Sequence, residues 1–97
     1  MKVVWSQVAR DQVVQAFGAI AAERPAAARR WLEEVLRKAG ALESFPDMGR
    51  MVPEVGRSSI REVPVTQYRL IYRRDKHQVV ILALRHCRRA SVCGELR

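Results

Sequence analysis

The sequence predicts an α+β fold in which a helical hairpin packs on one face of a small, mainly antiparallel sheet, in the order β-α-α-β-β-β. Two stretches before residue 45 repeat apolar side chains at helical spacing, and residues 60–85 are rich in β-branched and aromatic side chains. A segment with two prolines and two glycines separates the two halves. The 97 residues are expected to form one domain, with 87–97 as a polar tail.

The helical half begins after a short strand expected at residues 2–5. Ser6 stands where a helix N-cap belongs, and apolar residues then recur every three or four positions from Val8 to Ile20. Pro25 is suited to the first turn of a second helix, whose apolar stripe runs over 28–42. Because the two helices are joined so tightly, we expect them to be antiparallel.

The β half follows an expected loop at 45–59. Strands are predicted at 60–65, 67–73 and 78–85, and Pro64 suggests an edge position or a bulge. In the middle strand, alternation places Tyr68, Leu70 and Tyr72 on one face and Arg69, Ile71 and Arg73 on the other. In the last strand, unbroken alternation groups Val80, Leu82, Leu84 and His86 on one face.

The charge is large and uneven. Lys and Arg number 18 against 10 acidic residues, for a net charge of +8. Residues 1–54 hold eight basic and seven acidic side chains, whereas 55–97 hold ten and three. Since such an excess destabilises a compact chain by self-repulsion, it indicates nucleic acid, an anionic membrane or an acidic protein as partner.

Compartment and cofactors follow from what the sequence lacks. No signal-peptide core and no apolar run long enough to cross a bilayer is visible, so a cytoplasmic location is expected. Cys87 and Cys93 match no zinc motif, even with His77 and His86. No metal and no cofactor is therefore expected, and both cysteines are interpreted as free thiols.

A group of arginines is the main candidate for a functional site. Five of them fall on or beside strands expected to be neighbours, where they could converge on one sheet face or rim: Arg61, Arg69, Arg73, Arg85 and Arg88. The functional interpretation is an anion-binding surface for a phosphodiester or an acidic protein, and it is favoured for Arg69 and Arg85. The alternative is that each is solvated or pairs with a nearby carboxylate such as Glu62.

Other side chains have two possible roles. His86 could act as a general acid or base, but a lone histidine at a strand end is more often structural. Trp5 and Trp31 fall in apolar stripes and are expected in the core. Tyr68 and Tyr72 could stack on bases, yet their alternation with Leu70 favours the core.

These residues, taken in order, resemble the ParE/RelE toxin family. The resemblance is carried by the ordered strings 45–50 (Phe-Pro-Asp-Met-Gly-Arg), 60–63 (Ile-Arg-Glu-Val), 68–73 (Tyr-Arg-Leu-Ile-Tyr-Arg) and 85–86 (Arg-His), and it covers nearly the whole chain. It implies the RelE/ParE-like fold and a toxin of a type II toxin–antitoxin, or plasmid stabilisation, system. It also implies a cognate antitoxin whose toxin-binding region is acidic.

The family holds two activities. RelE-like members cut mRNA on the ribosome, whereas ParE-like members inhibit growth by poisoning DNA gyrase. Ile60 and Glu62 stand where some nucleases of the family carry lysines, and no tyrosine follows Tyr72. A nuclease could still use a set from this sequence: Glu54, Arg69, His86 and Arg88. Gyrase poisoning is the favoured interpretation, with the nuclease and a non-toxic binding module as alternatives, so the chain is not expected to be an enzyme.

Two surfaces are expected to receive the antitoxin. One is the basic rim of the sheet, which would steer an acidic partner. The other is an apolar groove beside the helical hairpin that could accept a helix. The residues expected in that groove are Val13, Phe17, Ile20, Trp31 and Val35.

Overall fold

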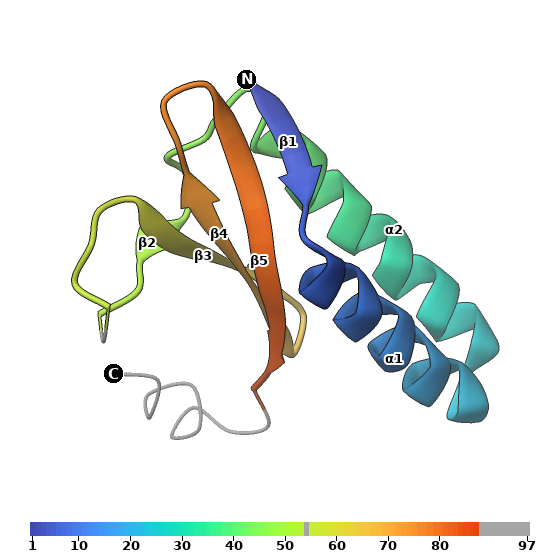
Figure 1. Cartoon of the computed structure of the whole chain (residues 1–97). Helices are drawn as coiled ribbons and strands as arrows, with labels where there is room; N and C mark the ends of the chain where they lie inside the picture. Colours follow the sequence, from blue (N-terminus) through green and yellow to red (C-terminus); the bar gives the residue numbers. More distant parts are fainter. Residues whose placement is uncertain (54, 88–97) are drawn as a thin grey trace.

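The computed structural model describes residues 1–53 and 55–87 and confirms the predicted α+β architecture (Figure 1). Its elements are β1 (Lys2–Trp5), α1 (Gln7–Glu23), α2 (Pro25–Ala41), β2 (Arg50–Met51), β3 (Ile60–Val65), β4 (Tyr68–Arg74) and β5 (Gln78–His86). The strands form one sheet in the order β1-β5-β4-β3-β2, with β1 parallel to β5 and the other pairs antiparallel. Both helices lie on the same side of the sheet.

The helix boundaries follow the local signals in the sequence. The Ser6 hydroxyl accepts a hydrogen bond from the Ala9 N–H at 3.1 Å, which caps α1 as predicted. Pro25 is the first residue of α2, where its missing N–H leaves no helical bond unmade. Only Arg24 separates the two helices, so they run back along each other as a hairpin.

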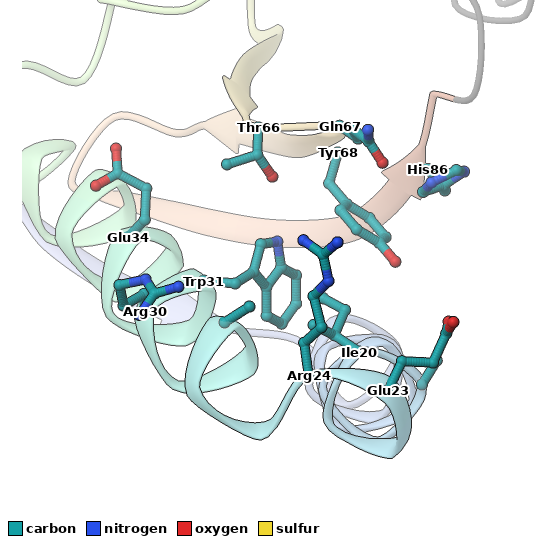
Figure 2. A pocket seen from close by; sticks show the side chains of 12 residues that line it. Ile20, Glu23, Arg24, Arg30, Trp31, Glu34, Thr66, Gln67, Tyr68 and His86 are labelled. Atoms are coloured by element: carbon teal, nitrogen blue, oxygen red, sulfur yellow. The ribbon is translucent and has the colours of Figure 1, made fainter.

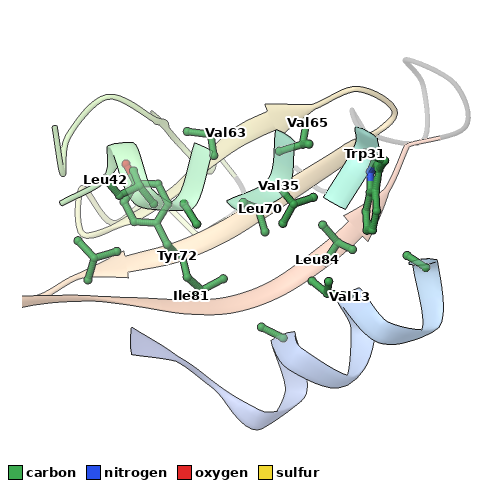
Figure 3. Packing of buried hydrophobic residues seen from close by; sticks show 14 residues of the cluster. Val13, Trp31, Val35, Leu42, Val63, Val65, Leu70, Tyr72, Ile81 and Leu84 are labelled. Carbon is green, nitrogen blue, oxygen red and sulfur yellow. The ribbon is translucent and has the colours of Figure 1, made fainter. Parts of the chain in front are cut away.

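The core lies between this hairpin and one face of the sheet (Figure 3). Val13 from α1 and Val35 from α2 meet Leu70, Tyr72 and Ile81 from the strands, and each is at least nine-tenths buried. On β4 the predicted alternation holds, because Leu70 and Tyr72 are buried whereas Arg69 and Ile71 face away from the helices. The other sheet face is left uncovered by α1 and α2.

The alternation predicted for the last strand is wrong in its first half. Val79, Ile81 and Leu84 are buried, so Leu84 does not share a face with Val80 as unbroken alternation requires. The register shifts by one residue, since Ile71 pairs with Ala83 but the next residue, Tyr72, pairs with Ile81. The extra residue is a bulge at Leu82, and it inverts the faces on either side.

Polar side chains from the N-cap and the second turn of α1 satisfy the backbone hydrogen-bonding groups at this bulge. The Ser6 hydroxyl donates to the Leu82 carbonyl at 3.1 Å, and the Leu84 N–H donates to the Gln12 Oε1 at 2.7 Å. β1 pairs only with residues 78–81, so these groups lie on the part of β5 that β1 does not reach. The N-cap and the first turns of α1 therefore supply hydrogen-bond partners to the part of the β5 edge that β1 does not cover.

The segment expected to be an irregular loop at 45–59 contains a two-residue strand, β2, and it is attached to the core by hydrogen bonds to the buried Tyr72. The Tyr72 hydroxyl donates to the Pro46 carbonyl at 2.8 Å and accepts from the Gly49 N–H at 3.0 Å. A Cβ on Gly49 would lie 2.7 Å from the Glu62 carbonyl oxygen, so only glycine fits beneath β3. Pro64 lies on the outer edge of β3 beyond β2, as predicted.

The cysteine prediction needs correction. Cys87 was expected to be a free thiol, but it is disulfide-bonded in the structure. Cys93 and the rest of the predicted tail at 88–97 lie outside the described residues. Among residues 1–53 and 55–87, no group of three His, Cys, Asp or Glu side chains is placed to hold a metal ion, and no helix is long and apolar enough to cross a membrane.

Candidate functional site

A wide groove opens at the end of the molecule where the helical hairpin turns (Figure 2). It has a volume of about 860 Å³ and lies between the end of α1, the first turns of α2, the β3–β4 turn and the end of β5. Its lining residues are Ala19, Ile20, Glu23, Arg24, Ala27, Arg30, Trp31, Glu34, Thr66, Gln67, Tyr68 and His86.

Three aromatic rings follow one another along the groove. The centroids of Trp31 and Tyr68 are 5.1 Å apart with the planes tilted by 56°, and those of Tyr68 and His86 are 4.7 Å apart, edge to face. Trp31 is only 5% exposed, and its indole Nε1 is buried without a hydrogen-bond partner. A buried donor left unpaired is destabilising, typically by about 1–3 kcal/mol.

The charged side chains around the groove are unevenly neutralised. Glu34 accepts two hydrogen bonds from Arg37, at 2.9 and 2.6 Å, and this contact lowers the pKa of the Glu34 carboxyl. Arg24 and Arg30 are exposed, and neither forms an ion pair with a described carboxylate. Glu23 contributes one exposed carboxylate at the end of α1. The groove therefore keeps two unpaired guanidinium groups beside an aromatic floor.

A second group of cations lies on the sheet face that the helices leave open. Arg69 on β4 and Arg85 on β5 are directly paired across the strands, as the sequence suggested, and neither has a described carboxylate partner. Like charges directly opposite each other repel, so this pair is favourable where an anion neutralises it. The buried Arg69 Nε also lacks a hydrogen-bond partner.

Beside this pair, Arg50 and Glu62 line a small cavity of about 190 Å³ with Pro64 and Arg69. The Arg50 Nε donates to a Glu62 carboxylate oxygen at 2.6 Å, although Glu62 is only 3% exposed. A carboxylate buried to this degree requires such a partner. Glu62 thus forms its ion pair with Arg50, and no ion pair joins it to Arg69 among the described residues.

The other expected members of the arginine group do not converge there. Arg61 pairs with Tyr72 across β3 and β4 and therefore lies on the face opposite to Arg69. It donates to the carbonyls of Ser58 and Gly49 at 2.9 and 2.8 Å and so holds the loop in place. Contrary to the expectation from the sequence, Arg61 therefore does not converge with Arg69 and Arg85. Arg73 is held by Asp75 at 2.7 Å, which lowers the pKa of that carboxyl.

The side chains suggested for a nuclease are also separated. His86 pairs with Tyr68 and stacks on it at the groove, whereas Arg69, the neighbour of Tyr68, points to the opposite face. The sheet itself lies between the imidazole and the guanidinium. Glu54 and Arg88, the other two members of that set, lie outside the described residues, and so does Arg88 as an anion-binding candidate.

The residues expected to bind an antitoxin are found in three environments. Val13 and Val35 are buried in the core and line no surface groove, because the sheet covers them. Phe17 and Ile20 are partly buried, and only Ile20 and Trp31 line the groove. The sequence did not predict that Arg24 and Arg30 line the groove, because the groove is closed by the β3–β4 turn, which lies about forty residues away in the chain.

A third surface is the loop that follows α2. Four of its large apolar side chains are at least 43% exposed: Phe45, Met48, Met51 and Val55. The loop backbone is nevertheless fastened from beneath by Tyr72 and Arg61. Burial raises the pKa of the Tyr72 phenol above its ordinary value, so the hydroxyl stays protonated and donates. A fixed loop that presents apolar side chains is typical of a protein contact.

Comparisons with known proteins identify the family to which a chain with this fold belongs. A family model described as the ParE toxin of the type II toxin–antitoxin system parDE matches residues 3–91, so the chain belongs to this family. A solved structure titled as the chromosomal ParDE TA system from P. aeruginosa superposes with a TM-score of 0.75 at 13% identity, covering 90% of this chain and 96% of that one. At this identity the likeness concerns the fold. No curated protein matches the sequence.

Proposed function

We propose that this ParE-type toxin inhibits bacterial growth by poisoning DNA gyrase and that a cognate antitoxin neutralises it. The family supports the toxin role, and the observation that favours gyrase over mRNA cleavage is the separation of Arg69 from His86. A general base and a phosphate-binding arginine must reach the same phosphodiester. Here the two groups lie on opposite faces of the sheet, so they cannot act together on one bond in this arrangement.

We assign contact with the target to two surfaces. The Arg69–Arg85 pair on the open sheet face is suited to an anion, either a DNA phosphate held by gyrase or a carboxylate of the enzyme itself. The apolar loop side chains Phe45 and Met48 suit a protein surface, because Met-rich patches adapt their shape to a partner. Both surfaces are separate from the groove at the hairpin turn.

We assign antitoxin binding to the groove, with Ile20 and Trp31 as its apolar contacts, and to the basic open face. The net charge of +8 favours fast association with an acidic partner. An antitoxin that covers Arg69 and Arg85 would also compete with the target. Neutralisation then requires no change in the fold of the toxin.

Induction of the chain alone in a bacterium tests the proposal. We expect growth arrest with filamentation and an SOS response, and relief when the cognate antitoxin is expressed from a second plasmid. The double variant Arg69→Gln/Arg85→Gln should be less toxic, whereas Arg29→Gln, an exposed helix residue remote from the open face, should remain toxic.

Two other outcomes would contradict the proposal. Rapid arrest of translation without an SOS response would indicate the ribosome as target. Normal growth with abundant folded protein would indicate a binding module without toxicity. Protein levels are measured in every culture, so that loss of the chain is not mistaken for loss of toxicity.

A further inference from the structure

Strand pairing places two rows of side chains on the sheet face that the helices leave open (Figure 1). Residues directly opposite each other in a sheet share a face, so Pro64, Arg69 and Arg85 form one row across β3, β4 and β5. The neighbouring row crosses four strands, from β2 to β5. Its members are Arg50, Glu62, Ile71 and Ala83.

The charge of these two rows is positive. Glu62 is their only carboxylate, and it is 3% exposed and accepts a hydrogen bond from the Arg50 Nε at 2.6 Å. Its charge is therefore offset by Arg50, whose own side chain is 52% exposed. Arg69 and Arg85 form no ion pair with a described carboxylate, and the buried Arg69 Nε has no hydrogen-bond partner. Two guanidinium charges on this face thus have no anion beside them.

The rows offer no side chain on which a base could stack. The sequence has two Trp, two Tyr and two Phe residues, and none of them falls in either row. Tyr68 and Tyr72 alternate onto the face that the helices cover. Proteins that bind single-stranded nucleic acid, or read RNA loops, stack bases on aromatic side chains. Arginines without such rings are suited to the phosphates of a duplex, which they contact without reading its sequence.

We propose that the open sheet face binds the phosphates of duplex DNA directly. This inference deepens the proposed function and rests on it for one point, that the DNA contacted in the cell is the segment held by gyrase. Arg69 and Arg85 present paired N–H donors to a phosphate. From β2 to β5 the face extends over about 14 Å, and phosphates of one strand advance about 3.4 Å along the helix axis, so Arg50 reaches a further phosphate.

An acidic protein segment is the alternative occupant, and the composition of the face favours DNA. The centre of a protein contact is usually rich in aromatic and methionine side chains. In this toxin such side chains are exposed in the loop that follows α2, at Phe45, Met48 and Met51, and not in the two rows. The apolar members of the rows are small or aliphatic. A protein partner therefore has a better surface elsewhere on the molecule.

Fluorescence anisotropy of a short labelled DNA duplex tests the inference without gyrase. Antitoxin-free toxin is titrated into the duplex at salt concentrations from about 50 to 200 mM, where each phosphate contact contributes about 0.9 to the slope of log Kd against log salt. The double variant Arg69→Gln/Arg85→Gln should raise the Kd at least about tenfold and lower that slope by about 2. A duplex of shuffled sequence should bind equally well.

Two variants separate a phosphate contact from a general loss of charge or of structure. Arg29→Gln removes one positive charge from an exposed position of α2, and its Kd and salt slope should equal those of the original chain. Arg85→Lys keeps the charge on the open face and should keep the salt slope, because a lysine ammonium also pairs with phosphate. Circular dichroism of each variant verifies that the fold is retained.

Three results would overturn the inference while leaving the proposed function standing. The first is duplex binding with the same Kd and salt slope in Arg69→Gln/Arg85→Gln. The second is tighter binding of single-stranded RNA than of a duplex of equal length. The third is displacement of the duplex by a polyglutamate peptide at lower charge concentration than by unlabelled duplex. If the variants weaken duplex binding as expected but the toxin does not poison gyrase, the proposed function fails and the phosphate site stands.

Discussion

The hydroxyl of Tyr72 connects the sheet to the loop that follows α2, and its removal should weaken the whole fold. Tyr72 is fully buried, and its hydroxyl makes two hydrogen bonds, one to the Pro46 carbonyl and one from the Gly49 N–H. A neutral hydrogen bond contributes about 0.5–1.5 kcal/mol net, and an unpaired buried N–H adds a desolvation penalty. Tyr72→Phe should therefore lower the free energy of unfolding by about 2–3 kcal/mol.

Urea denaturation followed by circular dichroism measures this change. The midpoint should fall while the slope stays constant, because the same surface is exposed on unfolding. In a thermal scan the Tm should fall by at least about 8 °C, since 1 kcal/mol corresponds to about 4–8 °C in a domain of this size.

Tyr68→Phe is the control, because Tyr68 lies on the same strand and its hydroxyl makes no hydrogen bond with a described residue. That variant should stay within about 0.5 kcal/mol of the original chain. If Tyr72→Phe is as stable as Tyr68→Phe, the loop is not held by the hydroxyl and the reasoning is wrong.

Three further predictions concern the Tyr72 hydroxyl, Gly49 beneath it and Arg85 on the open sheet face. Burial raises the pKa of Tyr72 above 10.0, so the stability that it contributes is complete below pH 10 and declines as the pH rises through the folded-state pKa. Tyr72→Phe should flatten this alkaline decline in unfolding experiments. Gly49→Ala should destabilise the fold by about 1–3 kcal/mol, because its Cβ would press against the Glu62 carbonyl oxygen and the Tyr72 ring; unchanged stability would show that the loop can shift freely. Arg85→Gln should slow antitoxin association and weaken its salt dependence in stopped-flow measurements, whereas an on-rate that is insensitive to salt in the original chain would contradict electrostatic steering.

Local signals in the sequence were sufficient for the helices and for most of the sheet. Ser6 and Pro25 mark helix starts through their own backbone chemistry, which does not depend on distant residues. Arg69 and Arg85 could be placed together because strand alternation is regular on β4 and beyond the bulge on β5. These features follow from spacing within a few residues.

The predictions that failed concern contacts between residues that are far apart in the sequence. The bulge at Leu82 is a single extra residue, and the groups that satisfy it come from Ser6 and Gln12, about seventy residues earlier. Arg24 looks like an ordinary connecting residue until the β3–β4 turn closes the groove around it. Arg61 lies on a strand with alternating faces, but alternation does not predict that its guanidinium donates to carbonyls of the preceding loop.

A gel assay with purified DNA gyrase, ATP and supercoiled plasmid tests the central claim most directly. The toxin, freed from its antitoxin, should cause gyrase-linked cleaved DNA to accumulate with increasing toxin concentration, and antitoxin added first should prevent this. The Arg69→Gln/Arg85→Gln variant should cause less cleaved DNA to accumulate at equal concentration, with Arg29→Gln as the matched control. If a toxin that arrests growth leaves the plasmid uncleaved, gyrase is not its target and the proposed function is contradicted.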